Sequence, residues 1–358
     1  MKKNICLFFI LCFFLFSGCS FPSRNSTDDS GFPAQSFENT VSGADLTNAE
    51  TTNNDGKSIT NESSKTIDNQ RSIILYYQDQ QGTLIPVTRR VSKEEALASL
   101  AINGLIDSAM NREELEYYGL YPILPKGTEI LGINLKEGNA TIEFNDKLLD
   151  YSSQIAENSI ITAIVYTLTE FSTIDKVKIW IKGNSTSKLK FGTDISEYLS
   201  RENVLINSSR VNTKLGLRKF DGFLFKNINE KFTYILPVSI ELSEMNVDKT
   251  IEKMVNSLAN EKQNKGLYTQ LPAKSGLLRG EIKGDVLTLD FNKEFSNYGG
   301  NAREDGILKQ ILYSAKQFKG INRIKLFVEG NDTYLLEGTD ISKEILIPKG
   351  INDFIDKV

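Results

Sequence analysis

The side chains that could carry out chemistry in this chain are carboxylates, because the usual partners of nucleophilic catalysis are absent. The 358 residues contain no histidine, and the three cysteines are Cys6, Cys12 and Cys19. A serine or cysteine nucleophile therefore has no imidazole to act as its base, and a structural zinc site of the Cys/His kind is excluded. Acid–base chemistry or metal binding would fall to aspartate and glutamate.

Asp194 and Asp340 are the clearest candidates, because both stand in the sequence Gly-Thr-Asp-Ile-Ser. A carboxylate that follows a glycine could bind a metal or act as a base. An aspartate in this setting more often accepts hydrogen bonds from the turn that follows, which here covers residues 196–199 and 342–345. We favour this capping role for both residues.

Two further pairs of carboxylates recur along the chain. Glu157 and Glu304 fall near the starts of predicted helices, where the positive end of the helix dipole favours a negative charge. Glu143 and Asp290 fall on the solvent side of predicted strands and are explained as part of a polar face. Because each pair has a structural explanation, we predict no catalytic residue, no cofactor site and no metal site.

Exposed aromatic side chains could instead form a sugar-binding face. The candidates are Tyr117, Tyr118, Tyr121 and the only tryptophan, Trp180. A core or half-buried position in a sheet explains Trp180 better, whereas surface contact and burial are equally expected for Tyr117 and Tyr118. Two carboxylates about 5 to 10 Å apart beside such a face could in principle cleave a glycan.

Most of the chain is an internal duplication. The matching segments are separated by 147 positions: Leu124-Pro125 recurs as Leu271-Pro272, Phe144-Asn145 as Phe291-Asn292, and Gly183-Asn184 as Gly330-Asn331. One residue is then lost, and Gly192–Ser196 reappears whole as Gly338–Ser342. The first copy carries about seven extra residues near Asn111 to Tyr118.

Each copy predicts the same order of elements, which must position the candidate residues. Ser92 is the expected cap of the first helix, with Glu94 and Glu95 in its first turn. Alternating and helical patterns in copy one predict strands at 72–77 and 83–89, a helix at 92–108, a strand at 139–144, a helix at 153–171, and strands at 176–181 and 189–192. Copy two repeats this with strands at 286–291 and 324–328.

These elements indicate an α+β fold, in which a βαββαβ-like unit with added edge strands occurs twice. Helices would pack on one face of a small mixed sheet in each copy. We therefore divide the chain into a leader at 1–18, a tether at 19–70, a first domain at 71–210 and a second at 218–350. The tether is rich in Ser, Thr, Asn, Asp and Gly, a composition that cannot recover the entropy lost on folding.

The leader resembles a bacterial lipoprotein signal. Lys2 and Lys3 precede an apolar run at 5–16 that is too short to span a bilayer, and Ser17-Gly18 lead into Cys19. The alternative is an ordinary secretory peptide with a chance cysteine. The resemblance implies cleavage before Cys19 and its modification with acyl chains such as palmitate. We therefore expect a lipid-anchored protein on the extracytoplasmic face of the cell membrane.

The overall charge argues against nucleic acid as a partner. The chain has 42 Lys and Arg against 46 Asp and Glu, a net charge of −4. Binding to phosphates requires clustered basic residues. No polybasic run follows Cys19, so the lipid must supply the anchoring.

The leader, the tether and the two copies together resemble the GerM family of sporulation and spore germination lipoproteins. Leu124-Pro125-Lys126-Gly127-Thr128 fits the family, whereas Leu271-Pro272-Ala273-Lys274-Ser275-Gly276 departs from it. The resemblance implies a fold related to ring-building domains, no catalytic residues, and a scaffold role with envelope or sporulation proteins as partners.

Three functions follow as hypotheses. The first is a non-enzymatic assembly lipoprotein in sporulation and germination. The second is a peptidoglycan-binding or wall-remodelling lipoprotein, motivated by Tyr117, Tyr118 and the duplicated carboxylates. A third, weaker hypothesis is a solute-binding lipoprotein, which would need larger doubly wound lobes than two small repeats provide.

Overall fold

The computed structural model describes residues 70–92, 96–185, 187–208, 219–241, 247–260 and 266–355. The predicted leader, the tether up to residue 69, Cys19, Glu94 and Glu95 lie outside these residues. Residues 61–358 form one unit by their internal contacts.

The first repeat opens with a long antiparallel hairpin whose strands contain continuous runs of buried residues. In it Ile73 pairs with Arg89 and Tyr76 with Pro86. A short third strand pairs with the other edge of the first, giving the order β2-β1-β3. The bounds are β1 Gln70–Asp79, β2 Leu84–Ser92 and β3 Leu120–Tyr121.

The rest of the first repeat forms a second, mixed sheet with the order β4-β5-β6. Strands β4 and β5 are antiparallel, and β5 and β6 are parallel because α3 crosses between them. Ser153 caps α3 by accepting a hydrogen bond from the Ala156 amide. The elements are α1 Leu97–Asn103, α2 Ala109–Glu116, β4 Ile130–Lys136, β5 Asn139–Phe144, α3 Gln154–Leu168 and β6 Lys176–Ile181.

The second repeat has the same plan, and its described residues hold no counterpart of α2. Its sheets have the orders β8-β7-β9 and β10-β11-β12-β13. The elements are β7 Lys219–Ile228, β8 Phe232–Glu241, α4 Val247–Asn260, β9 Leu267–Tyr268, β10 Leu277–Lys283, β11 Val286–Phe291, α5 Asn301–Ala315, β12 Arg323–Val328 and β13 Ile345–Leu346.

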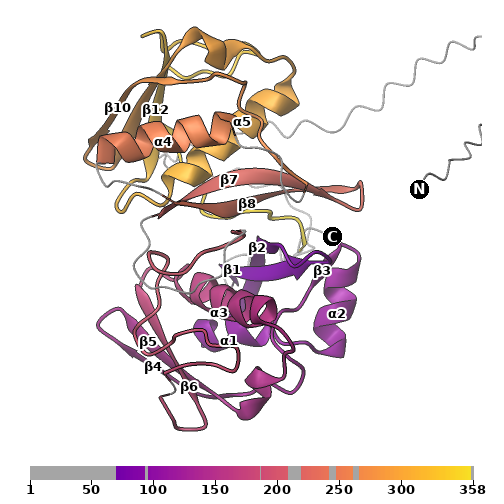
Figure 1. Ribbon diagram of the computed structural model, residues 1–358. Helices are drawn as coiled ribbons and strands as arrows, with labels where there is room; N and C mark the ends of the chain where they lie inside the picture. The colour runs from indigo at the N-terminus through magenta and orange to yellow at the C-terminus, as the bar shows by residue number, and fades with distance from the viewer. Residues whose placement is uncertain are drawn as a thin grey trace, which may run out of the picture. The chain divides into compact units, whose positions relative to one another are not determined.

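Helices α1 and α3 of the first repeat and α4 and α5 of the second lie between the two sheets of their repeat, as Figure 1 shows for α4 and α5, whereas α2 packs beside β3. Both faces of α3 therefore meet protein, and eleven of its residues are buried. Phe144 and Phe291 are fully buried on the inner faces of the mixed sheets. Full burial of such a side chain contributes about 1.5–3 kcal/mol. The α+β class and the duplication are as expected, and the structure adds that each copy has two sheets.

Two local predictions were wrong. Ser92 is the last residue of β2 and pairs with Gln70, so it caps no helix, and α1 begins only at Leu97. The hairpin extends further than its apolar core because its polar ends still pair by backbone hydrogen bonds. The strand predicted at 189–192 is a turn, closed by the Leu189 amide donating to the Thr193 carbonyl at 3.0 Å.

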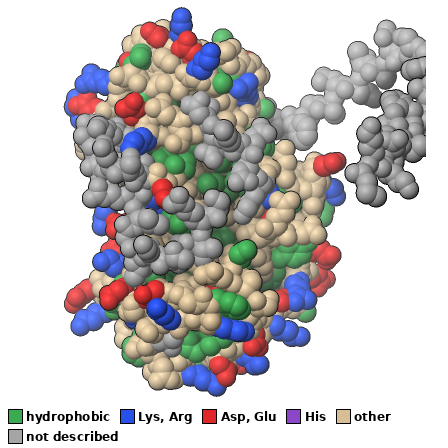
Figure 2. All heavy atoms as spheres, viewed as in Figure 1, with side chains coloured by type: hydrophobic (Ala, Val, Ile, Leu, Met, Phe, Trp, Pro, Cys, Tyr) green, Lys and Arg blue, Asp and Glu red, His purple; other side chains and the backbone are tan. Residues whose placement is uncertain are grey.

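None of the helices in the described part of the chain is both long and apolar enough to cross a bilayer. Acidic and basic side chains are interspersed over the face of the molecule seen in Figure 2.

The inserted segment near Asn111 forms helix α2, which Ser108 caps through the Asn111 amide.

Candidate functional site

Glu157 is the centre of a buried hydrogen-bond network and has no exposed surface. Its carboxylate accepts from the Tyr151 hydroxyl at 2.7 Å, the Phe191 amide at 2.7 Å and the Thr193 amide at 2.9 Å. The network joins the start of α3 to the loop after β6. Glu157 lies in the first turn of α3, as predicted, and the structure adds the hydrogen bonds to this loop.

Glu304 makes the same network in the second repeat. It accepts from the Tyr298 hydroxyl at 2.6 Å, the Glu337 amide at 2.7 Å and the Thr339 amide at 3.1 Å. The Thr339 hydroxyl donates to it as well. The tyrosine, glutamate and threonine of the duplicated motifs are thus neighbours in space, which explains why these residue types recur together.

Both carboxylates are held in their charged form. Burial alone would raise the pKa of Glu157, but hydrogen bonds from Thr193, Phe191 and Tyr151 outweigh it and lower the pKa below its ordinary value. The pKa of Glu304 is lowered in the same way, against the same opposing effect of burial. A carboxylate that accepts three or more hydrogen bonds and has a low pKa is a poor general base.

Asp194 and Asp340 cap the turns that follow them, as predicted. Asp194 accepts from the Ser196 amide at 2.9 Å and the Ser196 hydroxyl at 2.6 Å, and these bonds lower its pKa. Asp340 accepts from the Ser342 amide at 2.8 Å. The motif begins with glycine because Gly192 has φ of +95°, a conformation that residues with side chains rarely adopt.

The third duplicated pair lies on the outer face of the mixed sheets. Asp290 accepts from the Gly330 amide at 3.0 Å, and Glu143 stands opposite Trp180 in the pairing of β5 and β6. Within the described residues, histidine, cysteine, aspartate and glutamate form no group of three or more that could hold a metal ion.

The aromatic candidates divide between surface and core. Trp180 is 36% exposed and Tyr121 is 40% exposed, so both lie at the surface and Trp180 is less buried than predicted. Tyr117 is 62% exposed, whereas Tyr118 is 7% exposed and donates its hydroxyl to the Ile355 carbonyl. The two rings of the Tyr117-Tyr118 pair also contact each other, with centroids 5.2 Å apart. Only one of the two is thus available to an external ligand.

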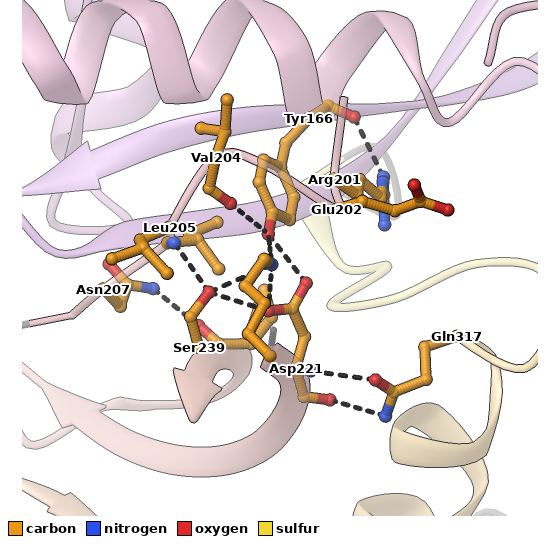
Figure 3. Close-up of polar contacts among 12 residues, drawn as sticks. Tyr166, Arg201, Glu202, Val204, Leu205, Asn207, Asp221, Ser239 and Gln317 are labelled. Carbon is orange, nitrogen blue, oxygen red and sulfur yellow. Dashed lines mark hydrogen bonds and ion pairs between the residues drawn. The ribbon is translucent and has the colours of Figure 1, made fainter. Parts of the chain in front are cut away.

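A polar cluster that was not predicted from the sequence joins the two repeats. Figure 3 shows the Tyr166 side chain of α3 pointing at the Asp221 carboxylate of β7. The Tyr166 hydroxyl donates to this carboxylate at 2.7 Å. The Lys219 ammonium contacts Tyr166 at 2.7 Å, Asp221 at 2.6 Å and the Ser239 hydroxyl at 3.1 Å. Burial lowers the pKa of Lys219 despite its acidic partner.

Glu170 forms a second polar contact between the repeats, beside a cavity of about 380 Å³. It accepts from Arg201 at 2.6 Å, from Lys316 of the second repeat at 3.1 Å and from the Tyr76 hydroxyl at 2.9 Å. Burial opposes the charge of Glu170, but the two cations lower its pKa to about 2. Glu170, Arg201 and Lys316 at this cavity are therefore paired with one another.

Apolar side chains are exposed at equivalent places on the terminal strands β4 and β10. Leu131 and Leu278 are 51% and 56% exposed, and Leu135 and Ile282 are 52% and 36% exposed. Each pair is separated by 147 positions. Leu131 and Leu278 are also the residues skipped where the pairing with the next strand shifts register. The fixed spacing was a signal in the sequence that could have identified these two edges.

Comparison with known proteins places these features in a family. The chain matches the Germane family, described as sporulation and spore germination, over residues 74–187 and 225–334. It is 26% identical over 289 residues to the spore germination protein GerM of Bacillus subtilis (strain 168), a match that covers 78% of this chain and 77% of that protein.

The fold is similar to a solved structure of the same relative. The tandem GerMN domains of the sporulation protein GerM from Bacillus subtilis superpose with a TM-score of 0.69 at 25% identity, covering 79% of this chain and 99% of that one. The family match spans both repeats and more than half of the residues. The chain therefore belongs to the Germane family of sporulation and spore germination proteins.

Proposed function

We propose that this member of a sporulation and germination family is a lipid-anchored, extracytoplasmic scaffold that binds envelope proteins and catalyses no reaction. The observation that carries the proposal is a contrast between two sets of duplicated residues. The duplicated buried carboxylates, Glu157 and Glu304, each accept three or more internal hydrogen bonds. The duplicated apolar residues of β4 and β10 are exposed.

Exposed apolar residues on a terminal strand favour a protein partner. Such a strand has backbone groups available for a further strand, and apolar side chains there add to the affinity. Leu131 and Leu278 occur at the same place in both repeats, so the two edges offer similar contacts. The surface charge is mixed, which suits a protein neighbour better than nucleic acid.

The anchoring part of the proposal rests on the leader and Cys19. Acyl chains on this cysteine would hold the folded repeats at the outer side of the membrane through the segment that follows. A C19A variant should move from the membrane fraction to the soluble fraction of sporulating cells. Full retention of C19A in the membrane would contradict lipid anchoring at this residue.

The partner is tested by photo-cross-linking in sporulating cells. A photoreactive amino acid at position 131 or 278 should capture the same envelope protein, identified by mass spectrometry. The matched control is position 155, because Ile155 is apolar and 72% exposed but lies on α3. The L131D/L278D double variant should lose the adduct and lower the yield of heat-resistant spores. A normal yield from this variant, or equal capture from position 155, would contradict the scaffold role.

The absence of catalysis has its own test. Purified protein is incubated with peptidoglycan, and both sedimentation and released fragments are measured. We expect neither, because the duplicated carboxylates Glu157, Glu304, Asp194 and Asp340 are engaged in internal hydrogen bonds. Release of soluble fragments would replace the scaffold by a wall-remodelling enzyme.

A further inference from the structure

The segment that ends the first repeat, Ile206 and Asn207, forms hydrogen bonds with the second repeat, and we call it the first hook. The Ile206 amide donates to the Ser239 hydroxyl at 2.8 Å, and the Ser239 amide donates back to the Ile206 carbonyl at 2.9 Å. The next residue, Asn207, accepts from the Leu84 amide and donates to the Leu84 carbonyl, both at 2.8 Å. The Asn207 amide group also donates to the Pro237 carbonyl at 2.8 Å. One asparagine thus bridges β2 and β8.

The segment that ends the second repeat, Ile351 and Asn352, forms equivalent hydrogen bonds with the first repeat and is the second hook. The Ile351 amide donates to the Thr88 hydroxyl at 2.7 Å, and the Thr88 amide donates to the Ile351 carbonyl at 2.9 Å. Asn352 accepts from the Ile235 amide at 3.0 Å and donates to the Ile235 carbonyl at 2.7 Å. It also donates to the Pro86 carbonyl at 2.7 Å.

The two hooks use equivalent residues throughout. Asn207 and Asn352 both have positive φ, +52° and +49°. The strand residues that they contact correspond in pairs, each 151 positions apart: Leu84 with Ile235, Pro86 with Pro237, and Thr88 with Ser239. Each repeat thus uses the same two sets of residues to contact the other. An interface of this kind is called isologous and is typical of a twofold dimer.

A buried ion pair joins Asp79 of the first repeat to Lys226 of the second. We call the contact between the two repeats the junction. The Lys226 ammonium lies 2.5 Å from the Asp79 carboxylate, and both side chains are about 5% exposed. Asp79 and Lys226 occupy equivalent positions in the two repeats. In the sheets, Asp79 lies opposite Leu120 of β3, and Lys226 lies opposite Leu267 of β9. In a twofold dimer, equivalent residues that touch each other lie at the axis.

The charges at this axis decide which repeats can pair. Two copies of the first repeat would bury Asp79 against Asp79, and two copies of the second would bury Lys226 against Lys226. A buried charge without an opposite partner is strongly destabilising. The pairing of unlike repeats is the combination that neutralises both charges.

We propose that the junction is a dimer-type interface that forms within one chain. The partner that also fits it is a second copy of this chain, whose second repeat would bind the first repeat of its neighbour and the reverse. The hydrogen bonds of both hooks and the Asp79–Lys226 pair remain available if two chains exchange repeats. Like repeats are excluded by charge.

The test uses two charge-reversal variants of the whole chain after Cys19, D79K and K226D. Each variant alone places like charges at the junction, so we expect its Tm to fall by roughly 10 °C. Unfolded together and refolded, they should form a dimer containing one chain of each. Such a dimer has one native Asp79–Lys226 junction and one reversed junction. Mass-tagged chains and light scattering identify it.

The D79K/K226D double variant in one chain keeps the test informative if the single variants fold poorly. It should stay monomeric and recover part of the lost Tm. The recovery is only partial because Asp79 also accepts from the Gln81 and Thr83 amides, which would oppose a lysine there. Refolded mixtures that contain no mixed dimer would overturn the proposal. Homodimers in either single variant would also overturn it, because every junction in such a dimer would place like charges together.

Discussion

The Glu157 carboxylate accepts the Thr193 amide at 2.9 Å, and this contact ties the start of α3 to the loop beyond β6. The equivalent contact from Thr339 to Glu304 measures 3.1 Å. The two networks explain why glutamate and the Gly-Thr motif recur at matching places in the chain. They are internal supports for each repeat, positioned about the first turn of the second helix.

Replacing either glutamate by glutamine should destabilise its repeat by about 2 kcal/mol. Glutamine has only one acceptor oxygen, and its amide group would face donors such as the Phe191 and Thr193 amides. E157Q and E304Q should cost similar amounts in urea unfolding. E129Q is the control, because Glu129 is exposed, and it should change stability by less than about 0.5 kcal/mol. Equal stability of E157Q and E129Q would contradict the supporting role.

Sequence patterns predicted the regular parts of the fold well. The strands β5, β6 and β11 begin and end where the alternation of apolar residues does, because each has one face on the core. Ser153 was correctly placed at the start of the second helix. Helix α2 was missed because only two of its eight residues are large and apolar, Met110 and Leu115, so it has no clear amphipathic period.

The pH dependence of stability should reveal Glu170. Its pKa of about 2 lies below the ordinary 4.5, so the stabilisation is fully present above about pH 4.5 and is lost as the pH falls towards 2. The contribution at neutral pH is ~3 kcal/mol. Unfolding in urea at about pH 6 and about pH 3 measures this loss. In E170Q the loss should be smaller, because glutamine does not titrate. An unchanged pH profile in E170Q would assign the loss to other carboxylates.

The junction could not be predicted from the sequence. Asp79 and Lys226 occupy equivalent positions but have opposite charges, so comparing the two copies shows a mismatch there and not a motif. Tyr166 and Asp221 likewise come from different repeats, and no periodicity links them. Contacts of this kind depend on how two finished units dock, which local patterns do not encode.

Asn207 and Asn352 should contribute equally to stability. Each side chain makes three hydrogen bonds, two within its own repeat and one across the junction, so N207A and N352A should each cost about 2–3 kcal/mol. Glycine variants separate the causes, because glycine accepts the positive φ without strain. N207G and N352G should be slightly more stable than the alanine variants in thermal unfolding. A large cost at only one of the two sites would contradict the equivalence of the hooks.

Tyr117 and Tyr118 should respond differently to substitution, although they are adjacent. Tyr118 packs on Phe232 and Phe354 with centroids 5.2 and 5.9 Å away, so Y118A should cost about 3–5 kcal/mol. Tyr117 is 62% exposed, and Y117A should cost less than about 1 kcal/mol. Y117A therefore tests glycan binding in a folded protein. Sedimentation of the parent chain with peptidoglycan that Y117A abolishes, at unchanged Tm, would favour a wall-binding face over a scaffold.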